Sequence, residues 1–250
     1  MKKLALSVCL FFITISIHAI SSNYEDGNLA YEQKNYAEAI EIYEANIAQN
    51  GGSATVYYNL ANAYYKINSF GKAVLNYERC LAIQPANEDA AFNLSLANLH
   101  TKDKLQPVNE PALNKWWRKF VSGRTPQFWG IIALCCIWIS LFGFIVFRFA
   151  KKIPAQKTGF YSSIIAFLCF IFFLFTTFSC LHFQKTYRFA IILAPSATLK
   201  SEPTESSTSL MLLHEGLKLQ ILSTEESWTE VKLADGNVGW LANTSIESVL

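Results

Sequence analysis

The chain has 250 residues, of which 52% are hydrophobic and only 16% are charged. Thirteen of the nineteen phenylalanines lie between Phe128 and Phe183, and this concentration argues against a single soluble globule. From Pro111 to Lys200 there are eleven bases and no acid, whereas the stretches on either side are acidic. Because the basic stretch is interleaved with membrane-like sequence and offers no positive face on a foldable domain, nucleic-acid binding is not expected.

The first nineteen residues have the pattern of an export signal. Lys2 and Lys3 precede an uncharged apolar stretch, and Ala19 supplies a small residue before a cleavage site. We predict a signal peptide over residues 1–19. The alternative is an uncleaved signal-anchor helix, which would deliver the following segment across the membrane in the same way.

A pattern with a period of 34 residues follows the signal. Its clearest copy has Tyr57, Leu60, Ala61, Tyr64, Phe70, Ala73, Tyr77 and Pro85. These positions resemble the tetratricopeptide repeat, with Cys80 in place of the small residue usual in that family. One period earlier, the matching positions are Gly27, Ala30, Tyr36, Ala39 and Tyr43.

One period later, Ala91, Leu94 and Ser95 continue the pattern to about His100, as a capping helix would. We therefore predict an all-α superhelix over residues 20–109, with two repeats and a cap, which is close to the smallest stable array. The alternative is an ordinary helical bundle with chance matches.

The resemblance implies a concave, peptide-binding face made by the first helix of each pair. The positions that map onto this face are Tyr24, Asn28, Tyr31, Tyr58, Asn59, Asn62, Tyr65, Lys66, Phe92 and Asn93. Asparagine both donates to and accepts from a peptide backbone, and tyrosine offers a flat body with a polar tip. The alternative is that these asparagines follow the repeat consensus and merely solvate the groove.

Two of these asparagines, Asn28 and Asn59, match positions of the family's carboxylate clamp. Its three basic partners are replaced here by Tyr24, Asp89 and Asn93. A ligand held by a C-terminal carboxylate is therefore not expected.

Two later stretches are long enough to cross a bilayer, which takes about 20 apolar residues. We predict transmembrane helices over residues 128–149 and 159–182, joined by a basic cytoplasmic loop over residues 150–158. The interfacial linker over residues 110–127 is equally basic, so the export signal decides the orientation. Four aromatic residues suit the headgroup region: Trp116, Trp117, Trp129 and Tyr161. A buried soluble hairpin is the alternative, and it would need a covering domain.

Residues 190–250 have β character. We predict strands over residues 190–193, 217–222, 228–233 and 238–241, with a loop over residues 201–209 and a turn at Asp235-Gly236. Short strands at this spacing suggest a small all-β barrel.

The motifs in this region resemble the bacterial Src-homology-3-like (SH3-like) domain. They are Leu199 and Pro203 at the start, the Glu215-Gly216 turn, Trp228, and the closing stretch from Asp235 to Trp240. The resemblance implies binding of wall peptides or proteins, with Trp228 and Trp240 in a ligand groove. Alternatively, both tryptophans belong to the core.

No catalytic constellation is evident in the sequence. The four histidines are scattered, no phosphate-binding glycine loop occurs, and Cys80 is the one cysteine outside the signal and the two apolar stretches. We expect a non-enzymatic protein with no metal and no cofactor.

The order of export signal, repeats, hairpin and SH3-like domain resembles the BatE family, named from an aerotolerance operon of Bacteroides. That resemblance implies a cell-envelope factor in the bacterial inner membrane, with both soluble parts periplasmic. Its implied partners are von Willebrand-type membrane proteins and a MoxR-type ATPase system. Two functions follow as hypotheses: a membrane-anchored scaffold acting through the repeat groove, or a cell-wall-binding anchor or sensor that grips peptidoglycan through the SH3-like domain.

Overall fold

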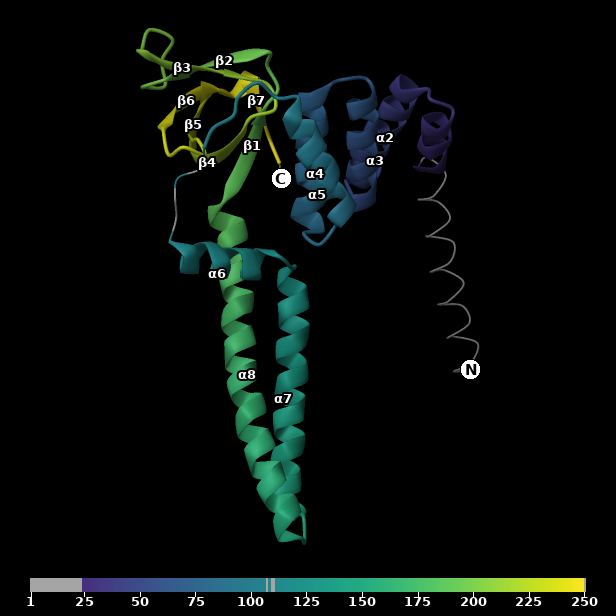
Figure 1. Cartoon of the computed structure of the whole chain (residues 1–250), viewed down its shortest axis with the longest axis vertical. Helices are drawn as coiled ribbons and strands as arrows, with labels where there is room; N and C mark the ends of the chain where they lie inside the picture. Colours follow the sequence, from purple (N-terminus) through teal and green to yellow (C-terminus); the bar gives the residue numbers. More distant parts are fainter. Residues whose placement is uncertain (1–23, 107, 109–110, 250) are drawn as a thin grey trace. The chain divides into compact units, whose positions relative to one another are not determined.

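A computed structural model describes residues 24–106, 108 and 111–249. The predicted signal peptide lies outside the described residues. The chain divides into two compact units, Met1–Val108 with Arg188–Leu250, and Asn109–Tyr187. Figure 1 gives the element labels.

The first unit begins with consecutive antiparallel helices. Residues 24–32 are helical, and the helices that follow are α2 (Tyr36–Asn50), α3 (Ala54–Lys66), α4 (Phe70–Ile83) and α5 (Glu88–Leu99). Helix α2 contacts α3, α3 contacts α4, and α4 contacts α5. The predicted helical repeat region is therefore confirmed.

Local signals set the helix ends. The Ser53 hydroxyl accepts from the Val56 amide at 3.3 Å and begins α3, and Asn87 caps α5 by accepting from Ala90 at 2.9 Å. Gly51 ends α2 with a φ of 79°, a conformation that costs glycine little. This turn joins one helix pair to the next.

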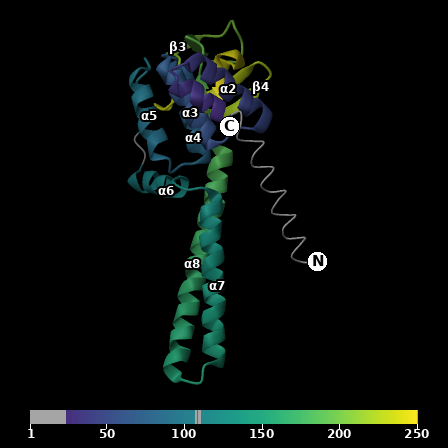
Figure 2. The same ribbon diagram turned by 90° about the vertical axis from the view of Figure 1, so that its right-hand side faces the viewer.

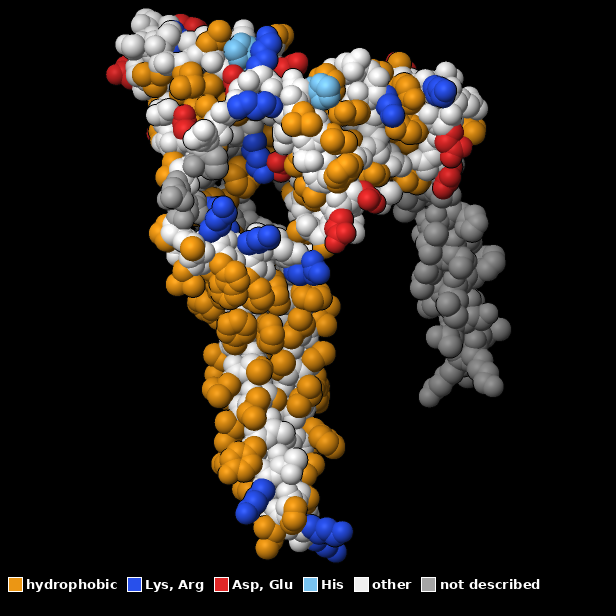
Figure 3. All heavy atoms as spheres, viewed as in Figure 1, with side chains coloured by type: hydrophobic (Ala, Val, Ile, Leu, Met, Phe, Trp, Pro, Cys, Tyr) orange, Lys and Arg blue, Asp and Glu red, His pale blue; other side chains and the backbone are white. Residues whose placement is uncertain are grey.

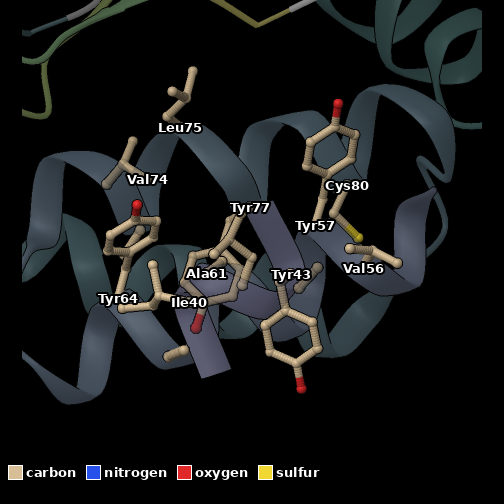
Figure 4. Close-up of a cluster of buried hydrophobic side chains, with 14 of the residues drawn as sticks. Ile40, Tyr43, Val56, Tyr57, Ala61, Tyr64, Val74, Leu75, Tyr77 and Cys80 are labelled. Carbon is tan, nitrogen blue, oxygen red and sulfur yellow. The ribbon is translucent and has the colours of Figure 1, made fainter. Parts of the chain in front are cut away.

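The helix core combines alanines and tyrosines with aliphatic side chains such as Ile40 and Val74 (Figure 4). Ala39, Ala61 and Ala73 are fully buried, and the rings of Tyr43 and Tyr77 are 1% exposed. A side chain at residue 27 would meet the Tyr43 ring at 2.6 Å, so the glycine there is required by close packing. This arrangement is the one expected from the repeat pattern.

The first unit ends in a seven-stranded antiparallel sheet in the order β3-β2-β6-β5-β4-β1-β7. The strands are β1 (Arg188–Ile192), β2 (Ser196–Lys200), β3 (Ser209–His214), β4 (Lys218–Glu225), β5 (Trp228–Lys232), β6 (Val238–Ala242) and β7 (Ile246–Ser248), with the short 3-10 helix η1 (Asn243–Ser245) before β7. The predicted antiparallel C-terminal strands are confirmed. The order is linear, so the described strands form an open sheet with β3 and β7 at its edges, and not the closed barrel that was expected.

Three strands were not predicted. The stretch Leu210 to Leu213 of β3 is an apolar run without alternation, which periodicity cannot assign to strand or helix. Strand β7 is three residues long, too short to show a period, whereas the five residues of β2 alternate between polar and apolar, a signal that was not used. Pairing with their neighbours, which sequence does not reveal, makes them strands.

One face of the sheet forms a core of its own that includes Leu199, Leu219 and Val231. Ile191 and Val249 are instead buried in the core of the helices. Within the first unit, the helices and the sheet therefore share apolar contacts.

The second unit holds α6 (Ala112–Ser122), α7 (Pro126–Phe149) and α8 (Ile153–Thr186). In both views, α7 and α8 run side by side as an antiparallel hairpin, and α6 lies across its end (Figures 1 and 2). Helix α8 already begins at Ile153, with Pro154 in its first turn, a position that suits proline. The basic segment between the helices is thus shorter than the predicted loop.

Small residues hold the hairpin together. A side chain at Gly159 would come within 2.6 Å of the Phe147 amide nitrogen, and the Ser140 hydroxyl donates to the Ser163 carbonyl at 3.0 Å. Helices α7 and α8 are long and apolar enough to cross a membrane. Within the most apolar 18-residue stretch of each helix, only 17% (α7) and 11% (α8) is buried. The outward side chains are mostly hydrophobic (Figure 3).

Candidate functional site

Polar side chains on the helices of the first unit form a hydrogen-bonded group of four residues. The Asn59 amide donates to the Asn28 carbonyl oxygen and to the Tyr24 hydroxyl, both at 2.9 Å. The Tyr43 hydroxyl donates to the same Asn28 oxygen at 2.8 Å. We call these residues the first quartet.

A second quartet repeats the first with an offset of 34 residues. The Asn93 amide donates to the Asn62 oxygen at 3.0 Å and to the Tyr58 hydroxyl at 3.3 Å. The Tyr77 hydroxyl donates to the Asn62 oxygen at 2.6 Å. The repeat in sequence is therefore also a repeat of side-chain hydrogen bonds.

The next period cannot form a third quartet. Phe92 and Leu96 stand where Tyr58 and Asn62 stand one period earlier, and neither can make these bonds. The series of quartets thus ends at helix α5, in keeping with the predicted role of this helix as a cap.

The quartets use only part of the hydrogen-bonding capacity of each asparagine side chain. Within the described residues, the Asn62 amide nitrogen and the Asn93 oxygen have no protein partner. Both side chains are half-buried. Since the free groups are one donor and one acceptor, together they match the two hydrogen-bonding groups of a peptide backbone.

A cavity of about 330 Å³ lies beside the second quartet. Its lining consists of Tyr31, Tyr58, Asn62, Tyr65, Lys66, Tyr77, Asn93 and Leu96. Six of these were predicted from the repeat register. Tyr77 was predicted to fill the gap between paired helices, and Leu96 was not singled out from the sequence.

The remaining predicted groove residues lie elsewhere. Tyr24, Asn28 and Asn59 belong to the first quartet. Phe92 is 63% exposed and does not line the cavity.

The cavity is nearly uncharged at neutral pH. Burial, followed by the neighbouring Tyr58 and Tyr31, raises the pKa of Tyr77 well above its usual value. Burial also raises the pKa of Tyr31. Lys66 is exposed and is the charged side chain of the lining. The surface therefore suits a polar or aromatic segment better than a strongly acidic one.

Trp228 and Trp240 lie on neighbouring strands β5 and β6. Both are half-buried, while Thr229 and Leu241 beside them are buried. They therefore lie on the sheet face opposite the core, and the alternative that placed them in the core is wrong. Glu230 is the direct cross-strand partner of Trp240.

The described residues contain no group of three His, Cys, Asp or Glu side chains placed to hold a metal ion. The groups that converge on the cavity are amides, phenols and one ammonium. Such groups bind by hydrogen bonding and ring contact.

The helical pairs and their hydrogen-bonded face define a helical-repeat region in the first unit. Residues 54–87 match the model of the Tetratricopeptide repeat family, which corresponds to α3, α4 and the turn to α5. Repeats of this family generally serve as scaffolds for protein–protein interaction.

Two curated proteins are similar over part of the chain. Sperm-associated antigen 1 of Rattus norvegicus is 31% identical over 88 residues, which is 35% of this chain and 10% of that protein. The Mus musculus protein of the same name is 36% identical over 73 residues, 29% of this chain and 8% of that protein. The chain thus spans about a tenth or less of the length of these relatives.

Proposed function

We propose that this protein is a membrane-anchored scaffold that binds a segment of a partner protein at the cavity beside the second quartet. The observation that carries this proposal is the convergence of Tyr31, Tyr65 and Lys66 on a cavity that still offers one amide donor and one carbonyl acceptor.

The quartets refine how the groove works. The Asn59 amide nitrogen donates to Asn28 and Tyr24, and Asn59 does not line the cavity, so in this proposal Asn59 aligns the helices. Recognition falls to Tyr31, Tyr65, Lys66 and the free groups of the second quartet. Because the quartets fix these positions before binding, little side-chain entropy is lost when the partner enters.

The anchor is the α7–α8 hairpin. Its large outward side chains include Trp138 at 70% and Phe142 at 69% exposure, which would be costly in water and favourable in hydrocarbon. With an export signal, the repeats and the sheet would lie in the periplasm of a bacterial inner membrane and Lys151 and Lys152 in the cytoplasm. The resemblance to BatE supports a place in an aerotolerance-type envelope complex with von Willebrand-type proteins and a MoxR-type ATPase system.

The scaffold role is tested by co-purification from membranes in mild detergent, followed by mass spectrometry. The Tyr65→Ala/Lys66→Ala pair should weaken capture of the partner by roughly tenfold or more, because truncating one aromatic anchor costs about 2 kcal/mol. The matched control is Leu99→Ala/Lys102→Ala, exposed positions outside this cavity. Full capture by the first pair, with unchanged helicity, would rule out this cavity as the binding site.

A second candidate is a wall-binding anchor or sensor. It is favoured by the position of Trp228 and Trp240 on the outer face of the sheet, where an SH3-like domain would receive a peptide. In that case, Trp228→Ala/Trp240→Ala should abolish retention of the chain on purified peptidoglycan, and the Tyr65→Ala/Lys66→Ala pair should leave retention unchanged.

A further inference from the structure

Helix α6 has one apolar side and one basic side. Trp117, Phe120 and Val121 face the hairpin. The Trp129 indole on α7 donates to the Val121 carbonyl at 3.2 Å, and the Phe120 and Trp129 rings lie 4.8 Å apart. These contacts fix the rotation of α6 about its own axis.

Part of the apolar side is left uncovered. Leu113 is 72% and Trp116 is 59% exposed. They lie one turn before Trp117 and Phe120 and continue the same stripe. Beyond α6, the apolar surface goes on along α7 and α8 (Figure 3).

The opposite side of α6 is cationic. Lys115 and Lys119 are one turn apart and exposed, and Arg124 is exposed just after the helix. The Arg124 guanidinium lies 5.7 Å from the centre of the Phe128 ring. No acid occurs anywhere from Pro111 to Lys200, so the segment contains no carboxylate to neutralise these charges.

We propose that α6 lies in the headgroup layer of a membrane and that Lys115, Lys119 and Arg124 bind the phosphates of anionic phospholipids. This inference rests on the proposed membrane hairpin. A short helix with aromatic residues on one side and lysine or arginine on the other is the form that lies in the plane of an interface. The uncovered Leu113 and Trp116 enter the boundary between headgroups and acyl chains, where tryptophan is favoured.

Charge complementarity selects the occupant. Three cations without acids match a layer of phosphate groups, and each base near an anionic surface strengthens binding about fivefold. The stripe from Leu113 to Phe120 is continuous with the lipid-facing surface of the hairpin, which a separate acidic protein would not cover. The lipid headgroup is therefore the ligand that fits both sides of α6.

The test is hydrogen–deuterium exchange of the full chain in lipid nanodiscs. One set contains phosphatidylcholine alone, and the other contains equal parts of phosphatidylcholine and phosphatidylglycerol. Peptides from residues 112–122 should exchange on the order of a hundredfold more slowly in the anionic discs, with three bases acting together. This difference should shrink at high salt.

The test variant is Lys115→Gln/Lys119→Gln/Arg124→Gln. In this variant, residues 112–122 should exchange equally fast in neutral and anionic discs. The matched control, Lys151→Gln/Lys152→Gln/Lys157→Gln, removes the same charge at the other end of the hairpin and should keep it. Inorganic phosphate added to neutral discs should have no effect, and slowing by phosphate alone would overturn the assignment to lipid.

Two failures are distinguishable. If α7 and α8 are protected but residues 112–122 exchange equally in both lipids, the headgroup site is wrong and the membrane anchor stands. If α7 and α8 exchange freely in the discs, the proposed anchor itself is wrong, and the headgroup site with it.

Discussion

The turn inside each helical pair places a non-glycine residue in the left-handed region. Lys34 has a φ of 65° and Asn68, one period later, a φ of 61°. The backbone hydrogen bonds of the two turns match as well. The Asn35 backbone amide donates to the Ala30 carbonyl, and the Ser69 backbone amide donates to the Tyr64 carbonyl, both at 2.9 Å. Asparagine tolerates this conformation and lysine does so less well.

Replacing the strained lysine should therefore stabilise the protein. We expect Lys34→Gly to raise the free energy of unfolding by about 0.5–1 kcal/mol, since relief of strain exceeds the added entropy of the unfolded chain. Glu41→Gly, at an exposed position inside α2, should instead lower it by about 1 kcal/mol. Urea unfolding measures the free energy of unfolding of both variants. If Lys34→Gly and Glu41→Gly are equally stable, the turn carries no strain.

The buried phenols make stability depend on alkaline pH. Burial, followed by the charge of Tyr24, raises the pKa of Tyr43 to about 12 from a usual value of 10.0. The folded state then keeps this proton after the unfolded chain has lost it. Stability from this group is complete below pH 10 and falls as pH rises toward 12, by up to about 1.4 kcal/mol per pH unit.

Urea unfolding at a series of pH values measures this slope. Tyr43→Phe has no proton to lose and should show a shallower fall above pH 10. It should also be less stable at neutral pH, because it lacks the bond to Asn28. An unchanged slope would show that Tyr43 does not cause the alkaline loss.

Sequence predicted which asparagines lie on the groove and not what they do there. Their positions follow from the period, which fixes the helix face. The bond between Asn59 and Asn28 joins residues 31 positions apart and depends on the distance between two helices, which no local pattern encodes. The binding role of Asn59 stays a prediction, and the hydrogen bonds of its amide nitrogen to Asn28 and Tyr24 were not predicted.

At the scale of elements, close helix contacts depend on alanine. Ala73 on α4 is fully buried, so Ala73→Leu should overpack the helix pair and cost roughly 1–3 kcal/mol. The same change at the exposed Ala91 on α5 should stay within about 0.5 kcal/mol. Thermal unfolding compares the two variants, and equal melting temperatures would contradict the observed packing of α4.

The sheet and the hairpin show where element prediction succeeds and fails. Strands β5 and β6 were found because residues 228–233 alternate and a turn follows at Asp235-Gly236. The closing β7 has three residues and is held by pairing with β1, to which it is distant in sequence. Helix α8 begins before the predicted span of residues 159–182. Gln156 and Lys157 lower the hydropathy, which limited the prediction, but both residues are compatible with a helix.

At the scale of the whole molecule, one arginine connects the helices of the first unit to its last strand. The Arg79 guanidinium on α4 donates to the Val249 and Ser248 carbonyls, each at 3.0 Å, and pairs with Glu247 at 2.7 Å. Nearby, Lys218 on β4 pairs with Glu78 at 2.6 Å. Since the Arg79 side chain is only 20% exposed, these bonds are partly shielded from water.

Removing this guanidinium should loosen the C-terminal strand. Arg79→Ala leaves the carbonyl groups of residues 248 and 249 without their donor, at a cost of about 1–3 kcal/mol. Amide exchange in β7 should then accelerate by about tenfold or more. Arg79→Lys should show a smaller effect, because lysine keeps the positive charge but lacks the planar set of N–H donors of the guanidinium. Wild-type exchange in Arg79→Ala would show that the arginine does not hold the strand.

The same contact has a consequence for the order of events during synthesis. Arg79 and Val249 are 170 residues apart, and the ribosome adds about 5–20 residues per second, so roughly 10–30 s separate their appearance. The nascent helices lack Val249 until the end of that interval and lack Ile191 for about its first two thirds, and both residues belong to their core. The helices of the first unit are therefore made with an open apolar surface, and in the proposed export of this chain a holding chaperone would act in this interval.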